Sequence, residues 1–60
     1  MEKPIYYRYT PRQEWILAYY RIGTAVEIDK SAQDLLQSVK DEGFSKAQVH
    51  IGEPKHGKKT

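Results

Sequence analysis

The chain has 60 residues, a formal net charge of +2 and no cysteine. This length permits one domain with a modest core, and the lack of cysteine excludes disulfides, thiolate metal sites and thiol nucleophiles. The charge is uneven, because residues 1–53 hold seven basic and eight acidic side chains, whereas 54–60 adds three lysines and no acid. We therefore predict a single small domain over residues 1–53 and a flexible basic tail over 54–60.

The first predicted element is a β-hairpin. Ile5–Tyr9 is rich in tyrosine, which favours strands, and Thr10–Gln13 suits a type I turn because Pro11 occupies its second position. Glu14–Ile22 is then the return strand. Together these segments hold all five tyrosines, the only tryptophan and all three arginines of the chain.

A helix over Pro11–Ile22 is the alternative for the second half of this stretch. Thr10 would be its N-cap and Pro11 its first residue, both of which are favoured at those positions. We prefer the hairpin because a strand ending at Tyr9 would leave no connection to such a helix. The run Trp15–Tyr20 is also apolar all round, which does not suit a surface helix.

Three elements follow the hairpin. Ala25–Ile28 alternates apolar and polar residues, which predicts a short third strand. An amphipathic helix is expected over Ala32–Glu42, with Ser31 as its N-cap, Gly43 as its left-handed stop and Phe44 packed on the last turn. Lys46–Ile51 alternates again and predicts a final strand.

The predicted order is β-β-β-α-β. It corresponds to a small α+β domain in which an antiparallel-rich sheet has one helix packed on one face. The alternative order is β-α-β-α-β, with Pro11–Ile22 helical. The sequence leaves open which edge of the sheet receives the last strand.

A hairpin turning at Pro11 sorts its side chains onto two faces, because cross-strand partners lie on the same face. The face expected to meet the helix carries Ile5, Tyr7, Tyr9, Ile16, Ala18, Tyr20 and Ile22. The face expected to stay uncovered carries the candidate partner-binding residues Tyr6, Arg8, Trp15, Leu17, Tyr19 and Arg21. A register slip of one residue would mix the two sets.

An uncovered face with tyrosine, tryptophan and arginine is typical of protein–protein interfaces. We therefore expect a small binding or regulatory protein that contacts a second copy of itself, as a homodimer, or another protein. The alternative is a module that binds single-stranded nucleic acid, because bases stack on the same residue types. In that case the tail residues Lys55, Lys58 and Lys59 would contact phosphates.

Other kinds of function have little support in the sequence. Two histidines without cysteine do not suggest a metal site, and no glycine-rich phosphate loop is present. We expect no catalysis, no cofactor and no small-molecule substrate. The chain has no apolar run of membrane-spanning length and no signal-peptide pattern, so the expected location is the cytoplasm, away from the membrane.

Overall fold

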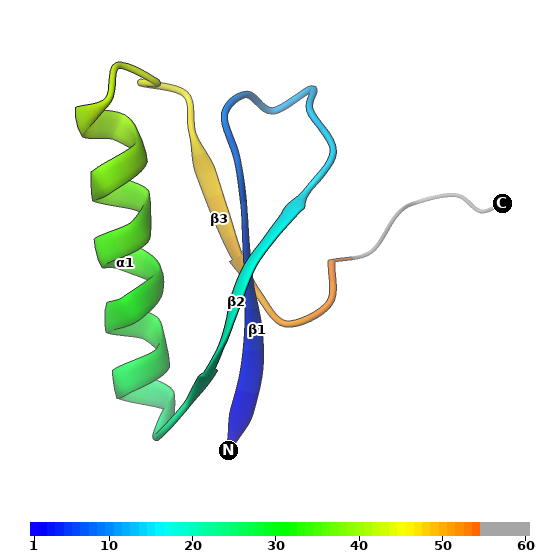
Figure 1. Ribbon diagram of the computed structural model, residues 1–60, viewed down its shortest axis with the longest axis vertical. Helices are drawn as coiled ribbons and strands as arrows, with labels where there is room; N and C mark the ends of the chain where they lie inside the picture. The colour runs from blue at the N-terminus through cyan, green and yellow to red at the C-terminus, as the bar shows by residue number, and fades with distance from the viewer. Residues whose placement is uncertain (55–60) are drawn as a thin grey trace, which may run out of the picture.

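A computed structural model gives the fold of the chain and describes residues 1–54 (Figure 1). It comprises the strands β1 (Glu2–Arg8) and β2 (Ile16–Ile22), the helix α1 (Ala25–Asp41) and the strand β3 (Gln48–Ile51). The strands form one antiparallel sheet in the order β2-β1-β3, and α1 lies on one side of it. The predicted α+β class, with an antiparallel sheet and a helix on one face, is confirmed.

The hairpin is also confirmed. The backbone N–H of Gln13 donates to the carbonyl of Thr10 at 3.1 Å, which closes the predicted turn. The side-chain oxygen of Gln13 accepts from the backbone N–H of Tyr9 at 2.8 Å and braces the end of the turn. Because Ile16–Ile22 is a strand, the helical alternative for Pro11–Ile22 is wrong.

A β-bulge in β2 changes the predicted register part-way along the hairpin. Tyr6 pairs with Leu17, and Tyr7 pairs with Ile16, as the turn at Pro11 requires. Ile5, however, pairs with Tyr19, so Ala18 is an extra residue on β2. Because side chains alternate along a strand, the extra residue moves everything beyond it to the opposite face from the one predicted.

The helix begins earlier than predicted, and the strand expected at Ala25–Ile28 is wrong. Thr24 is the N-cap, because its hydroxyl accepts from the Glu27 N–H at 3.2 Å while the Glu27 carboxylate accepts from the Thr24 N–H at 2.8 Å. This reciprocal capping box fixes the start of α1 at Ala25. Ser31, predicted as the N-cap, therefore lies inside the helix.

The end of the helix follows the prediction. Gly43 has a φ of +111° and donates its N–H to the carbonyl of Lys40 at 2.9 Å, a left-handed ending that suits glycine. The ring centroid of Phe44, which was expected to pack on the last helical turn, lies 4.4 Å from that of Tyr9. β3 then pairs antiparallel with β1, which settles the edge that the last strand joins.

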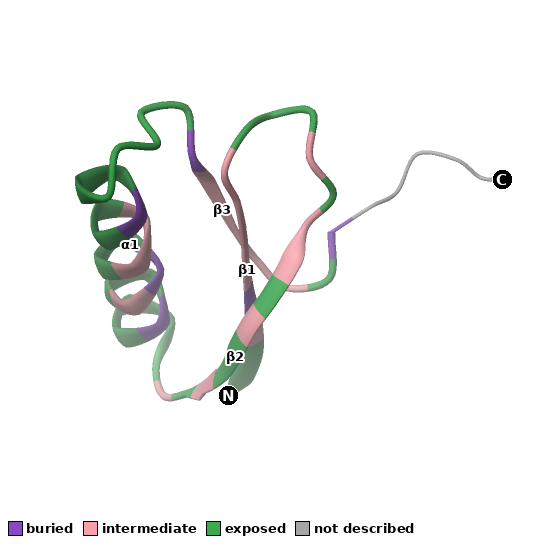
Figure 2. Ribbon diagram, turned by 45° about the horizontal axis from the view of Figure 1, so that its top comes forward, coloured by how far each residue is buried: buried purple, intermediate pink, exposed green. Residues whose placement is uncertain are grey.

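The core is small and lies on the β1 and β3 side of the sheet. Helix α1 packs mainly on β3. In residues 1–54 the buried side chains of the core are Ile5, Ile28, Ala32, Val39 and Ala47, and Leu35, Val49 and Ile51 pack against the cluster of Ile5, Ile28 and Ala32. No residue of β2 is buried (Figure 2). Strand β2 is therefore the least covered element of the described fold.

Candidate functional site

One face of the sheet lies opposite α1, and we call it the open face. Cross-strand partners share a face, so the register assigns its members directly. They are Glu2, Pro4, Tyr6 and Arg8 of β1, Leu17, Tyr20 and Ile22 of β2, and Gln48 and His50 of β3. Trp15, just before β2, joins them through ring contacts with two of these residues.

Four of the six predicted partner-binding residues lie together on the open face. They are Tyr6, Arg8, Trp15 and Leu17.

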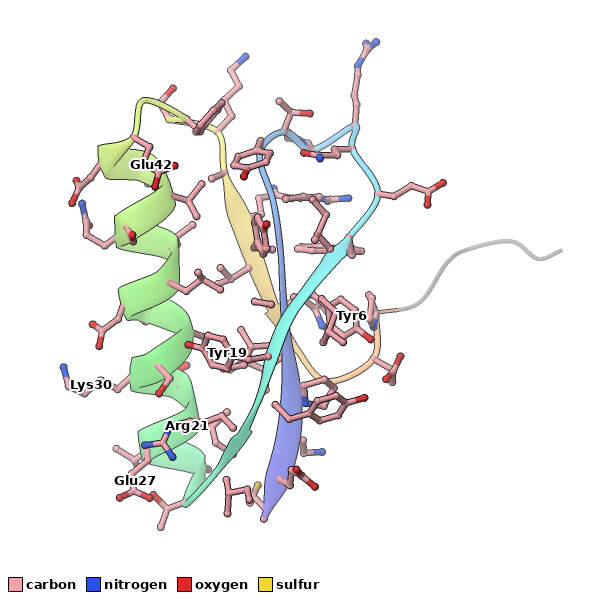
Figure 3. The ribbon with its side chains drawn as sticks, viewed as in Figure 1. Tyr6, Tyr19, Arg21, Glu27, Lys30 and Glu42 are labelled. Carbon is pink, nitrogen blue, oxygen red and sulfur yellow. The ribbon has the colours of Figure 1, made fainter. Side chains whose placement is uncertain are left out.

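Tyr19 and Arg21 do not lie there. Both point towards α1 (Figure 3), where the Tyr19 hydroxyl donates to the Ser31 carbonyl at 3.5 Å and Arg21 Nε donates to the Ser31 hydroxyl at 2.9 Å. Their predicted placement is wrong because the bulge at Ala18 reverses the faces beyond it.

The same bulge puts two other apolar side chains on the open face. Tyr20 and Ile22, predicted to meet the helix, are 55% and 67% exposed. No pattern in the sequence marks Ala18 as a bulge residue, so these two members could not be found before the structure. The alternation of the last strand places Gln48 and His50 on one face, and its pairing with β1 identifies that face as the open face.

The side chains of Arg8, Trp15 and His50 cluster at the turn end of the open face. The guanidinium carbon of Arg8 lies 4.1 Å from the centroid of the Trp15 ring, a cation–π contact, and the rings of Trp15 and His50 are 5.5 Å apart. Arg8 Nε also donates to the side-chain oxygen of Gln48 at 2.8 Å, and its Nη1 donates to the Gln13 carbonyl at 3.3 Å. These contacts hold Arg8 in one orientation.

Tyr6 lies at the middle of the open face and points away from α1 (Figure 3). Its hydroxyl donates to Glu53 Oε1 at 3.1 Å. Partial desolvation, followed by this contact with a carboxylate, raises the pKa of Tyr6 above its ordinary value.

The segment after β3 turns onto the same side of the sheet. Gly52 donates its N–H to the Pro4 carbonyl at 2.8 Å, and Pro54 is buried. Figure 1 shows this segment on the side of the sheet away from α1. The open face is thus bordered at one end by the chain's own residues 52–54.

The open face carries no excess of basic side chains among the described residues. Arg8 is the only lysine or arginine that the three strands place there, since Lys3 and Arg21 belong to the face that meets α1. The carboxylates of Glu2 and Glu53 lie on or beside the same face. The predicted tail lysines Lys55, Lys58 and Lys59 lie outside the described residues.

A pocket of about 350 Å³ lies on the opposite side, where the starts of β1 and α1 meet the end of β3. Its lining residues are Met1, Lys3, Ala25, Ile28, Asp29 and Ile51. Among the described residues that line it, Lys3 and Asp29 have the only charged side chains, so it has few convergent polar groups that could orient a substrate. Within residues 1–54, no cluster of three or more His, Asp or Glu could hold a metal ion. In the same part of the chain, no helix has the length and apolarity needed to cross a membrane.

Comparison with protein-family models, with curated proteins and with solved structures finds no match to this chain. Any inference about function therefore depends on the residues and contacts described above.

Proposed function

We propose that this protein is a non-enzymatic binding protein that contacts another protein chain through the open face. The observation that carries the proposal is the row of apolar side chains on that face of β2. Leu17, Tyr20 and Ile22 are all exposed, and they adjoin the half-buried Tyr6 and Trp15. Contiguous apolar surface of this kind on a small domain usually marks an interface.

The chemistry of the row supports a protein partner. Tyrosine, tryptophan and arginine are the residue types that contribute most to binding energy at protein interfaces. Arg8 and Trp15 are already held by their contacts with each other and with Gln48, so little side-chain entropy is lost when a partner binds.

The charge of the open face favours protein over nucleic acid. A surface that binds single strands needs several cations to neutralise phosphates. Arg8 is the one basic side chain that the three strands place on this face. The carboxylate of Glu53 accepts a hydrogen bond from the Tyr6 hydroxyl, and at that position it would repel a phosphate. Single-stranded nucleic acid is therefore the second candidate, and an oligonucleotide-binding experiment tests it.

Site-specific photo-crosslinking tests the proposal. A benzophenone side chain would replace Tyr20, which is exposed on the open face, and in a matched control it would replace Gln33, which is exposed on α1. We expect protein adducts, with the protein itself or with another chain, from position 20 and few from position 33. Equal adducts at both positions would refute the proposal.

The nucleic-acid alternative predicts a different property of the purified protein. In that case purified protein would bind single-stranded oligonucleotides at low salt, with affinity that falls as salt rises and falls further in Arg8→Ala. We expect no such binding.

A further inference from the structure

Strand β2 is an edge strand with exposed side chains on both of its faces. The order β2-β1-β3 leaves one edge of β2 without a partner in the described chain. Seven large apolar side chains are exposed in residues 1–54, and four of them belong to this strand. They are Leu17, Tyr19, Tyr20 and Ile22. The exposed apolar surface is therefore concentrated at one edge of the sheet.

This edge carries few of the features that prevent strands from pairing between molecules. Such features include short strands, proline, exposed lysine and β-bulges, and of these β2 has only the bulge at Ala18. Strand β2 has seven residues, no proline and no lysine, whereas the opposite edge strand, β3, has four residues. The one charged residue of β2, Arg21, is hydrogen-bonded to Ser31 of its own helix.

We propose that a second copy of this chain pairs with the free edge of β2, antiparallel and about a two-fold axis that passes beside Tyr20. The inference rests on the proposed function, because it names the partner that meets the open face along its β2 edge. The two sheets would join into one sheet of six strands, since each copy contributes three. The apolar rows on β2 of the two copies would then lie side by side.

The register follows from the faces and the charges. An axis at Tyr20 places the two Tyr20 rings opposite each other on the open face, where aromatic pairs stabilise a sheet. It also places Arg21 opposite the partner's Tyr19 on the other face, which allows a cation–π contact.

The two neighbouring registers are less favourable. An axis at Arg21 would set two arginines directly opposite each other, which is destabilising. An axis at Tyr19 would set Arg21 opposite the partner's Leu17, although the bulge directs those two side chains to different faces. Of these three registers, only the one centred on Tyr20 matches both face and charge.

A second copy fits this edge because the pairing is self-complementary. An antiparallel pair of identical strands buries the same patch on both subunits, which is how two-fold dimers form. A chain of 60 residues without disulfides, whose core within residues 1–54 consists of five buried side chains, also gains stability from such an association. One strand pair buries less than a standard interface of about 1,600 Å², so we expect a weak dimer whose population depends on concentration.

Single-cysteine crosslinking tests the register, because the natural chain has no cysteine. Residues directly opposite across an antiparallel pair have Cα atoms within disulfide range. We expect Tyr20→Cys to oxidise readily to a disulfide-linked dimer. The matched control is Val26→Cys, on the exposed surface of α1, which should remain largely monomeric under the same conditions.

Sedimentation of the full chain tests the association itself. We expect a monomer–dimer equilibrium in the micromolar range, weakened at least about tenfold by Tyr20→Glu, which places two like charges opposite each other. Tyr20→Phe keeps the aromatic pair and should leave the equilibrium nearly unchanged. Far-ultraviolet circular dichroism of each variant checks that the fold is retained, which is expected because Tyr20 is exposed.

Three results would overturn the inference. One is a monomer across the whole concentration range. Another is a dimer that Tyr20→Glu does not weaken, and the third is equal crosslinking of Tyr20→Cys and Val26→Cys. If the chain is a monomer and benzophenone at position 20 still captures a different protein, the proposed function stands and only the second copy is refuted. If position 20 captures nothing, both fail.

Discussion

Arg21 Nε donates a hydrogen bond of 2.9 Å to the hydroxyl of Ser31, which joins the uncovered strand β2 to the helix α1. Few other contacts link these two elements, because α1 packs mainly on β3. Ser31 lies in the middle of α1, where serine normally weakens a helix, and its hydroxyl is used here to orient a side chain of the sheet. The bond thus fixes on the α1 side an arginine that the bulge at Ala18 already turns away from the open face.

Arg21→Ala and Ser31→Ala should each lower the free energy of unfolding by about 0.5–1.5 kcal/mol, the usual value of one hydrogen bond. Because both variants remove the same bond, the double variant should cost less than the sum of the two. Urea unfolding, followed by circular dichroism at low protein concentration, measures all three. Arg12→Ala, in the exposed turn, is the control and should change stability little. Strict additivity would show that the bond does not contribute.

Deleting Ala18 should preserve the faces of the hairpin. The deletion removes the bulge, after which Leu17 opposite Tyr6 and Tyr19 opposite Ile5 form a regular ladder. Tyr19 and Arg21 would still face α1, so we expect a folded protein with stability within about 1 kcal/mol of the natural chain. Nuclear Overhauser effects between the Tyr19 ring and protons of α1 measure the outcome.

An insertion provides the contrast. One alanine added between Tyr20 and Arg21 would move Arg21 to the open face and break its bond to Ser31. This variant should be less stable than the deletion. If the deletion unfolds the protein while the insertion is tolerated, the bulge has a role that the register does not explain.

The bulge that these two variants probe also marks the limit of what the sequence predicts about the fold. The turn at Thr10–Gln13, the hairpin, the glycine stop at Gly43 and the last strand all depend on local signals of turn, cap and alternation, and the structure contains them. The bulge at Ala18 has no local signal, because an alanine fits a regular strand equally well. The open face was therefore predicted correctly on the turn side of Ala18 and reversed beyond it.

The predicted start of the helix is wrong for a different reason. Val26, Glu27 and Ile28 alternate over too few residues to distinguish a strand from a helix. The signal that decides the start is the pair Thr24 and Glu27, which have the spacing of a capping box, and Ser31 lies inside the helix that they begin. Partner identity, in contrast, depends on a second molecule, which no intramolecular pattern describes.

The capping box should make the stability of α1 depend on pH. The hydrogen bond from the backbone N–H of Thr24 lowers the pKa of the Glu27 carboxyl below its ordinary value. A lowered folded-state pKa means that the carboxylate stabilises the fold above the pKa of the unfolded chain. That stabilisation is lost as the pH falls through the folded-state pKa.

Thermal unfolding of the natural chain and of Glu27→Gln across acidic pH measures this effect. As the pH falls through the folded-state pKa of Glu27, we expect the natural chain to lose stability. Glu27→Gln should lose less, because the glutamine amide oxygen accepts the same hydrogen bond and does not titrate. Thr24→Ala, which removes the other half of the box, should cost about 1 kcal/mol. Parallel curves for the natural chain and Glu27→Gln would contradict the assignment.

The contact between Arg8 and Trp15 can be followed directly, because Trp15 is the only tryptophan of the chain. Arg8→Ala removes the cation that lies 4.1 Å from the ring centroid, together with the hydrogen bond to Gln48. We expect the emission of Trp15 to shift to longer wavelength as water reaches the ring. The free energy of unfolding should fall by about 1–2 kcal/mol.

Arg8→Lys separates charge from shape at this contact. Lysine keeps the cation but lacks the planar group that stacks on the ring and donates to Gln48, so we expect an intermediate shift and an intermediate loss of stability. Arg12→Ala, in the turn, is the control and should leave the emission unchanged. If Arg8→Ala also leaves it unchanged, Arg8 does not cover Trp15 in solution. The open face would then present a mobile arginine that could reach a phosphate, which would strengthen the nucleic-acid alternative.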